Sequence, residues 1–411
     1  MKRDNEIIRA LAEKTMEVAH DPVQDRRRKL WADVNSLRSH EVPVYVLDPQ
    51  GMWEEACPKL ECEDPFLRGY ENWLRLQLYH ASFGDDFVTE KYITMPPVLV
   101  SPDPHWRSWG IPNEYTRVAG TKAFHYTEYL DAEDDLDRIK IPNATVDRQK
   151  TDENMEKLAE ATGGVIPIYM DMYPQYRQNL SSMFALYYGT TNVLYQFYDS
   201  WDFMHKLADK FSKAVYKLNK QAERDGWFNS VNRTFGSNAE IQAMAYNHEI
   251  ANPDVPETVP MKRHWLYDCA QEFESVSPQM HDELLFNYMK PVYEEFGLFA
   301  YGCCENLTKK LDILMKISNL RRVAVTPWAD DEECAQVLRD RYVISWRPNP
   351  AEMITNGFDE DRITRIVKRA KAIYEKYNCF WEVNLKDFLT VEHDVGRLEK
   401  WVTTVRRALE S

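Results

Sequence analysis

The chain has 411 residues, of which 44% are hydrophobic and 13% aromatic, enough for a large folded core. Its formal charge of −15 argues against nucleic acid or an anionic membrane surface as the main partner. No apolar run reaches the length of a membrane span, and the charged N-terminus lacks the features of a signal peptide. We therefore expect a cytoplasmic protein whose seven cysteines are reduced.

Residues 1–95 have the pattern of helices joined by proline-rich turns, with a short strand candidate at 42–47. We expect this segment to be a helical N-terminal extension. From about residue 96, short apolar runs alternate with amphipathic helices to the end of the chain. The apolar runs are 98–100, 165–170, 264–269, 298–303, 323–326, 342–346 and 379–383.

This alternation predicts a parallel sheet covered by helices, and a closed (β/α)8 TIM barrel over 96–411 fits it best. The predicted helices include 201–224, 279–296, 306–317, 331–339, 360–377 and 395–410. A doubly wound open sheet is the alternative, but no glycine-rich phosphate loop follows any strand. The segment 227–262, rich in Asn and Pro, interrupts the pattern, and we interpret it as an insertion at one barrel face that could act as a lid.

In a barrel the catalytic groups lie at the carboxyl ends of the strands. That rule selects Asp171, Asp268 with Cys269, the turn Cys303 to Glu305, Thr326 with Trp328, Trp346 with Arg347, and Glu382. In an extended backbone Cys303 and Cys304 point to opposite sides, so we expect only one of them at the barrel mouth and favour Cys304.

Cys304 would suit a zinc site, because a catalytic zinc needs three protein ligands and an open position, and thiolate and carboxylate both serve. We predict Glu274 as a second ligand and Cys379 as a third, with Glu272 and Glu382 as substitutes. The competing interpretations are that the thiols are only packed side chains, or that Cys304 is a nucleophile with His248 of the insertion as its base. A disulfide between the adjacent Cys303 and Cys304 would be strained.

Several stretches resemble the uroporphyrinogen decarboxylase superfamily over roughly 160–411. They are the Ser-Pro-x-Met helix start at 276–280, the strand and turn at 299–306, the strand end at 267–268 and the strand at 342–350. One branch of that family consists of zinc-using, corrinoid-dependent methyltransferases with a His-x-Cys turn. Here Gly302 stands at the His position and Cys304 matches the Cys. In the related demethylases of aryl methyl ethers, a carboxylate precedes the Cys at a spacing that Glu274 reproduces.

The resemblance implies a zinc-assisted methyltransferase that moves a methyl group from a small methylated substrate, such as an aryl methyl ether, to a corrinoid on a partner protein. Its expected catalytic residues are Cys304, Glu274 and Asp268, its substrate-binding residues Asp171, Trp346 and His248, and its metal ligands Glu274, Cys304 and Cys379. One alternative is a metal-free lyase in which Asp171 or Asp268 steers protons. Another is a non-catalytic barrel that binds a corrinoid or tetrapyrrole. The oligomeric state stays open, with a homodimer among the options.

Overall fold

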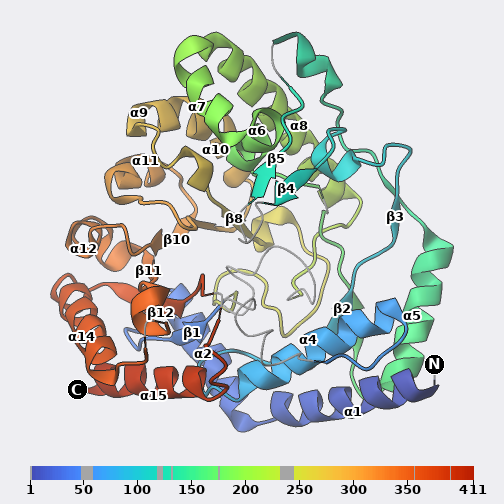
Figure 1. Cartoon of the computed structure of the whole chain (residues 1–411), viewed down its shortest axis with the longest axis vertical. Helices are drawn as coiled ribbons and strands as arrows, with labels where there is room; N and C mark the ends of the chain where they lie inside the picture. Colours follow the sequence, from blue (N-terminus) through green and yellow to red (C-terminus); the bar gives the residue numbers. More distant parts are fainter. Residues whose placement is uncertain are drawn as a thin grey trace.

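A six-stranded parallel sheet, curled into a half-barrel, forms the centre of the molecule (Figure 1). The structure is a computed structural model that describes residues 2–47, 59–117, 124–130, 133–174, 176–231, 245–355, 357–388 and 390–411. The order of the strands in the sheet is β1-β12-β11-β10-β9-β8. Their bounds are β1 (Val44–Val46), β8 (Trp265–Asp268), β9 (Leu298–Tyr301), β10 (Leu320–Val325), β11 (Val343–Trp346) and β12 (Phe380–Leu385).

The other strands form three pairs. β2 (Ile93–Met95) runs parallel to β7 (Ile168–Met170), whereas β3 (Leu99–Val100) with β6 (Thr145–Val146) and β4 (Tyr115–Arg117) with β5 (Phe124–Tyr126) are antiparallel. The parallel sheet with neighbours in chain order confirms the barrel-type winding over the doubly wound alternative. Within the described ranges, however, no ladder joins the six-stranded sheet to the β2–β7 pair, so the barrel is not closed.

Helices surround the strands on the outside (Figure 1). They are α1 (Lys2–Ala19), α2 (Pro22–Asn35), α4 (Pro65–Ala81), α5 (Arg148–Thr162), α6 (Leu180–Tyr188), α7 (Thr190–Asp199), α8 (Trp201–Arg224), α9 (Pro278–His281), α10 (Asn287–Tyr293), α11 (Leu311–Leu314), α12 (Asp331–Leu338), α13 (Pro350–Met353), α14 (Glu360–Lys376) and α15 (Arg397–Glu410). The predicted helix at 279–296 is interrupted by a π-helical segment, Asp282–Phe286. No helix in the described ranges is both long and apolar enough to cross a membrane.

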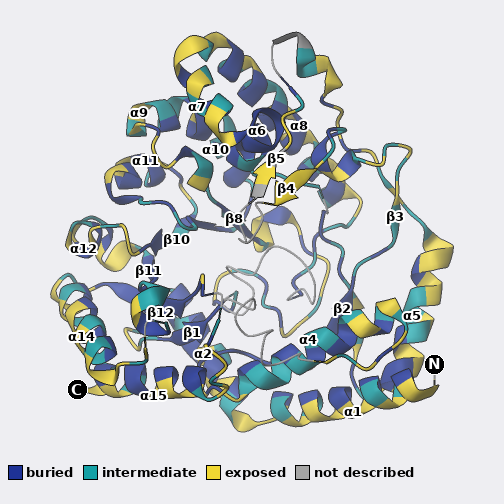
Figure 2. Cartoon of the chain, viewed as in Figure 1, coloured by how far each residue is buried: buried dark blue, intermediate teal, exposed yellow. Residues whose placement is uncertain are grey.

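Helix α14 shows how local sequence sets these elements. The Asp359 side chain accepts a hydrogen bond from the Arg362 backbone N–H at 2.9 Å and so caps the first turn. One face then buries Ile363, Val367, Ala370 and Tyr374 against the sheet and α15. Burying an aliphatic side chain of this size contributes about 1.5–3 kcal/mol. Figure 2 shows the resulting pattern, with buried strands inside helices whose outer faces are exposed.

Alternate residues of the strands face two different environments. Leu266, Phe299, Val323, Ile344 and Trp381 belong to the apolar core under the helices. The intervening positions face the interior of the half-barrel, and several of them are buried polar residues, namely Arg322, Ser345, Arg347, Glu382, Asn384 and Lys386. A polar interior of this kind is expensive unless its groups are paired, so the contacts among these residues decide what the site can do.

Residues 1–95 share the sheet with the C-terminal half. β1 pairs with β12 through Val44 opposite Val383 and Val46 opposite Leu385, and β2 pairs with β7. The strand predicted at 42–47 is therefore confirmed, but the segment is not only a helical extension, because it supplies strands to the central architecture. A domain boundary at residue 95 would divide both the six-stranded sheet and the β2–β7 pair.

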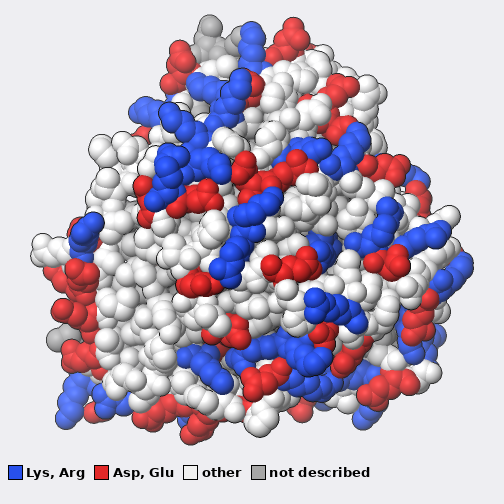
Figure 3. All heavy atoms as spheres, turned by 180° about the vertical axis from the view of Figure 1, so that it is seen from behind, with Lys and Arg blue, Asp and Glu red and all other residues white. Residues whose placement is uncertain are grey.

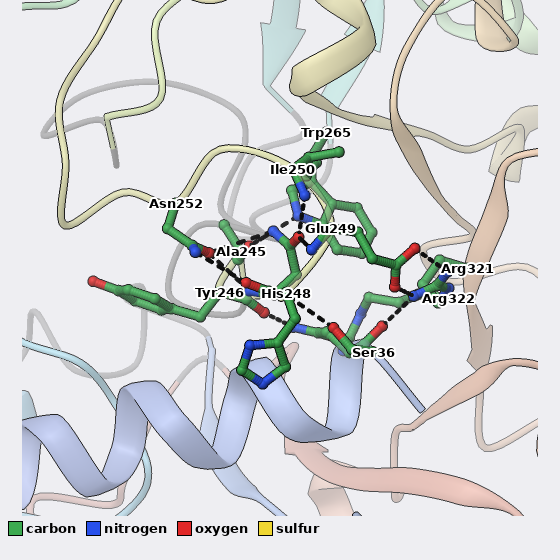
Figure 4. A network of polar contacts seen from close by, with 12 residues as sticks. Ser36, Ala245, Tyr246, His248, Glu249, Ile250, Asn252, Trp265, Arg321 and Arg322 are labelled. Atoms are coloured by element: carbon green, nitrogen blue, oxygen red, sulfur yellow. Dashed lines mark hydrogen bonds and ion pairs between the residues drawn. The ribbon is translucent and has the colours of Figure 1, made fainter. Parts of the chain in front are cut away.

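Residues 245–252 of the insertion lie at the amino end of the sheet (Figure 4), whereas Asn229 donates a hydrogen bond to the carbonyl of Met170, the last residue of β7. The Ala245 carbonyl accepts a hydrogen bond from Trp265 Nε1 at 2.9 Å, and Glu249 forms an ion pair with Arg321. Trp265 and Arg321 stand at the beginnings of β8 and β10. Residues 245–252 therefore lie at the end opposite the predicted active site, and the lid interpretation is wrong for these residues. Residues 232–244 lie outside the described ranges.

Figure 3 shows acidic and basic side chains interspersed on the face seen from behind. No large basic patch gathers on this face, which agrees with the net charge of −15. A nucleic-acid surface would need a continuous stripe of Lys and Arg.

Candidate active site at the carboxyl end of the half-barrel

The turn after β9 brings two sulfur atoms to the same side of the backbone. The strand ends at Tyr301, and Gly302 has a φ of 104°, a conformation that favours glycine. A Cβ at this position would also lie 2.9 Å from the Cβ of Ala324. Because the backbone bends here, Cys303 Sγ and Cys304 Sγ lie 3.4 Å apart. The prediction that only one of the two would face the mouth is wrong, since it assumed an extended backbone.

Glu305 joins this turn to the one after β8. Its carboxylate accepts hydrogen bonds from the backbone N–H groups of Cys303 at 2.8 Å and Ala270 at 2.9 Å. The side chain is fully buried, and burial raises the pKa of its carboxyl group. The shared acceptor holds the two loops together, and it brings Cys269 next to Cys303.

Three free thiols thus form one cluster, which we call the thiol cluster: Cys269, Cys303 and Cys304, all half-buried. Hydrogen bonds from Cys269 and Cys304 lower the pKa of Cys303 strongly, against the effect of burial, and the charges of Lys386 and Arg347 add to the effect. The same hydrogen bonds, together with burial, raise the pKa of Cys269 and Cys304. Of the three thiols, Cys303 is therefore the one most readily deprotonated.

Lys386 provides the direct cation for this thiolate. Its Nζ donates a hydrogen bond to Cys303 Sγ at 3.2 Å, and its side chain is almost wholly buried. On the other side of the cluster, Cys304 Sγ lies 3.5 Å from Asp387 Oδ2. Both residues directly follow β12, so a third strand end contributes to the cluster.

A small hollow with a cationic lining lies beside the turn. It is lined by Tyr267, Ala300, Tyr301, Gly302, Arg322, Ala324, Ser345 and Arg347. Arg347 donates a hydrogen bond to the Cys303 carbonyl at 2.5 Å, and the Tyr267 hydroxyl donates one to the Gly302 carbonyl at 3.4 Å. Arg322 is ion-paired with Glu382. The charge of Arg347 is thus placed next to the thiolate and the hollow, where it favours an anionic group.

Asp268 lies beneath the cluster. One carboxylate oxygen accepts hydrogen bonds from Asn179 at 2.5 Å and from the Cys269 backbone N–H at 2.8 Å, and the other accepts one from the Tyr293 hydroxyl at 2.6 Å. Burial raises its pKa to about 7. With 6% of its surface exposed, Asp268 holds the end of β8 in place, and the structure does not present it to a substrate.

The predicted zinc ligands do not come together. Glu274 is exposed, and its carbonyl oxygen accepts a hydrogen bond from Lys310 at 3.1 Å. Cys379 precedes β12, whereas Lys386 follows it, so this thiol lies at the opposite end of the strand; it donates to the Ala335 carbonyl at 3.6 Å. Across the described ranges, no group of three or more His, Cys, Asp or Glu side chains is arranged to hold a metal ion.

The predicted substrate-binding residues are also dispersed. Trp346 packs outward against Trp381, with ring centroids 5.9 Å apart, under the helices. His248 pairs with Asp33 at 2.8 Å at the amino end of the sheet, so it cannot serve as a base for Cys304. Asp171 is buried directly after β7. Successive residues of a strand point to opposite faces, so Ser345 and Arg347 line the hollow whereas Trp346 faces the other way. The sequence prediction therefore placed Trp346 on the wrong face of β11.

Sequence reasoning missed Lys386 and Asn179. Lys386 follows a strand that ends at Leu385, two residues beyond the predicted end, so the strand-end rule would have selected it if the boundary had been right. Asn179 caps α6 by accepting from the Ser182 backbone N–H, and its amide also donates to Asp268 and Cys269. Nothing in its local sequence indicates that second role.

Comparison with known proteins gives a fold and no family. No family model matches the chain, and no curated protein is similar to it in sequence. Among solved structures, it is similar to a methyltransferase from Methanosarcina mazei, with a TM-score of 0.51 and 12% sequence identity. The alignment covers 92% of this chain and 97% of that one. At this identity the likeness shows a shared fold over nearly the whole length of both chains.

Proposed function

We propose that the protein is a methyltransferase in which the Cys303 thiolate takes a methyl group from a small methylated substrate. The observation that carries the proposal is the surroundings of the Cys303 sulfur, with Cys304 Sγ 3.4 Å away, the Lys386 ammonium 3.2 Å away and Cys269 beside it, next to a cationic hollow. The fold likeness to a methyltransferase supports the reaction type.

The proposed step is a displacement at the methyl carbon. The Cys303 sulfur attacks in line, a sulfur–carbon bond forms, and the bond between carbon and the leaving group breaks, with the electron pair going to the leaving group. Lys386 then gives that group a proton. The ammonium loses its neighbouring negative charge when the thiolate becomes a neutral thioether, which lowers its hold on the proton. Arg347 stabilises negative charge in the hollow while the bond breaks.

The finer part of the proposal concerns the donor and the acceptor. We propose a methoxyarene as the donor and a corrinoid on a partner protein as the final acceptor, on the basis of the resemblance of the turn at 301–306. A corrinoid, when bound by such a partner, would supply a strongly nucleophilic acceptor for the methyl group. Because Glu274 and Cys379 lie away from the thiol cluster, the proposed step uses no zinc ion.

Methyl labelling of the purified chain tests the step directly. The protein is incubated with methyl-labelled donors, including a methoxybenzoate, a methylated amine and a methyl thioether, and then digested for mass spectrometry. We expect one labelled methyl group on the Cys303 peptide with one donor class. Cys303→Ser should abolish the label, and Cys334→Ser, which changes a buried thiol elsewhere, should keep it. Absence of label on Cys303 with every donor contradicts the proposal.

The acceptor is tested in a second stage with the labelled protein. Reduced cobalamin is added, and the label on Cys303 is followed with time. Loss of the label only in the presence of the reduced acceptor supports the corrinoid part. Label that stays on Cys303 contradicts that part and leaves the first step intact.

A further inference from the structure

We propose that Cys303 is also a peroxide-sensitive modification site and that Cys269 resolves its oxidised form into a Cys269–Cys303 disulfide. The modification needs no methyl donor. Only its effect on activity rests on the proposed function, since both reactions use the same sulfur. The geometry that carries the proposal is the placement of three half-buried thiols at two neighbouring strand ends, with Cys304 Sγ 3.4 Å from Cys303 Sγ and Cys269 hydrogen-bonded to Cys303.

The reactive sulfur is marked by its surroundings. A peroxide reacts with a thiolate that solvent can reach, and Cys303 is half-buried with Lys386 and two thiols as hydrogen-bond donors. Cys62, Cys334 and Cys379 differ, because they are buried and burial raises the pKa of each thiol to about 12. The chain thus contains its own unreactive reference thiols.

The chemistry balances with a hydroperoxide as the one oxidant. The Cys303 sulfur attacks the terminal peroxide oxygen, a sulfur–oxygen bond forms, the oxygen–oxygen bond breaks, and an alcohol or water leaves after taking a proton. The Cys269 sulfur then attacks the sulfenic sulfur. The sulfur–sulfur bond forms, the sulfur–oxygen bond breaks, and the hydroxide leaves as water with the proton of the Cys269 thiol.

Cys269 is a better resolving thiol than Cys304 on geometric grounds. Adjacent residues have Cα atoms about 3.8 Å apart, below the roughly 4.4–6.8 Å of ordinary disulfides. Cys269 and Cys303 instead follow paired strands, in which Asp268 stands opposite Tyr301 and the Gly302 N–H donates to the Asp268 carbonyl at 3.0 Å. Neighbouring strands lie about 4.8 Å apart, which suits a disulfide between the loops that follow them.

Peptide mapping without reduction tests the inference on the full chain. After treatment with a small excess of hydrogen peroxide, we expect a peptide pair linked through Cys269 and Cys303 that dithiothreitol separates. Oxidation at Cys303 should be at least about tenfold faster than at Cys334. Cys304→Ser should still form the disulfide. Cys269→Ser should instead accumulate a sulfenic acid on Cys303 that dimedone traps.

Two results overturn the inference: a disulfide between Cys303 and Cys304 as the main product, or oxidation of Cys303 no faster than that of Cys334. The Cys269→Ser variant keeps the test valid if Cys304→Ser folds poorly. Because the assay contains no methyl donor, its outcome is independent of the labelling experiment. If the disulfide forms but no methyl label is found, the proposed function is wrong and the oxidation site still stands.

Discussion

The two ends of the half-barrel use polar side chains in different ways. At the amino end, Glu249 forms an ion pair with Arg321 (Figure 4), and His248 Nε2 lies 2.8 Å from a carboxylate oxygen of Asp33, so these polar groups lie in contact with a partner. At the carboxyl end, Lys386 also has an acidic partner, Asp387 at 3.8 Å, but its Nζ donates to the Cys303 sulfur as well, and Arg347 lies near the same sulfur and lines the hollow. Ion pairs occur at both ends, and the reactive end differs because two cations there also face one nucleophilic sulfur.

The interior between the two ends is a buried polar network. Arg322 is ion-paired with Glu382 and donates to the Asn35 side chain at 2.6 Å, while Ser345 donates to Glu382 at 2.7 Å. These groups are paired with one another and act structurally, although they line the same interior as Arg347. Their substitution should therefore affect stability and leave the thiol cluster unchanged.

The largest effect is expected from Arg322→Met. The change leaves the Glu382 carboxylate buried without its guanidinium partner, so we expect a loss of about 3–5 kcal/mol in the free energy of unfolding, measured by urea denaturation. The double variant Arg322→Met, Glu382→Leu should recover much of this loss. Alkylation of Cys303 in the folded variant should be unchanged. A stability within experimental error of the parent would show that the network is not structural.

Asp268 should make stability depend on pH. Its pKa is raised from 3.8 to about 7, so the native state binds a proton that the unfolded state has lost in this range. The Asp268 contribution is therefore fully present at low pH and is lost as pH rises through about 7. At about 1.4 kcal/mol per pKa unit, the difference is about 4 kcal/mol, and Asp268→Asn should remove it. Parallel pH–stability curves for the two proteins would contradict this account.

Lys386→Met tests the reactive end with a moderate effect. Removing an ammonium 3.2 Å from the sulfur raises the pKa of the Cys303 thiol, so alkylation of Cys303 by iodoacetamide should become about tenfold slower at acidic pH, where the parent thiol becomes protonated. Lys309→Met is the matched control, because Lys309 is exposed and pairs with Glu333. An equal rate in the variant and the parent would show that Lys386 does not affect the Cys303 thiol.

The smallest effect is expected from Glu249→Gln at the amino end. The ion pair with Arg321 is partly exposed, so its loss should cost about 0.2–1 kcal/mol, less at high salt. Urea denaturation at low and high salt measures it. Glu333→Gln, in the more exposed pair with Lys309, should cost less still. A change in Cys303 reactivity in Glu249→Gln would break the separation of the two ends.

The sequence predicted the strands of the half-barrel well because each is a short apolar run between amphipathic helices. The runs at 264–269, 342–346 and 379–383 differ from β8, β11 and β12 by at most two residues at either end. Closure of the barrel, and the end at which the insertion docks, depend on contacts between distant segments. Periodicity carries no information on such contacts, which is why the position of residues 245–252 at the amino end could not be predicted.

The candidate site could be predicted only in part. The strand-end rule correctly selected Cys269, Cys303, Cys304 and Arg347 as neighbours in space. It could not show that Gly302 turns both cysteines to one side, because that depends on a positive φ next to Ala324. The prediction of Glu274 rests on its spacing from Cys304, and that of Cys379 on its place on the last strand; the structure leaves Glu274 exposed and puts Cys379 at the opposite end of β12.

The most direct test of the central claim is the pH dependence of Cys303 alkylation, followed by mass spectrometry on the intact chain. We predict a rate at Cys303 that is nearly constant between about pH 5 and about pH 8, because its neighbours strongly lower the pKa of this thiol. Cys269 and Cys304 should stay slow over the same range. A rate at Cys303 that rises about tenfold per pH unit, as for an ordinary thiol, would contradict the account.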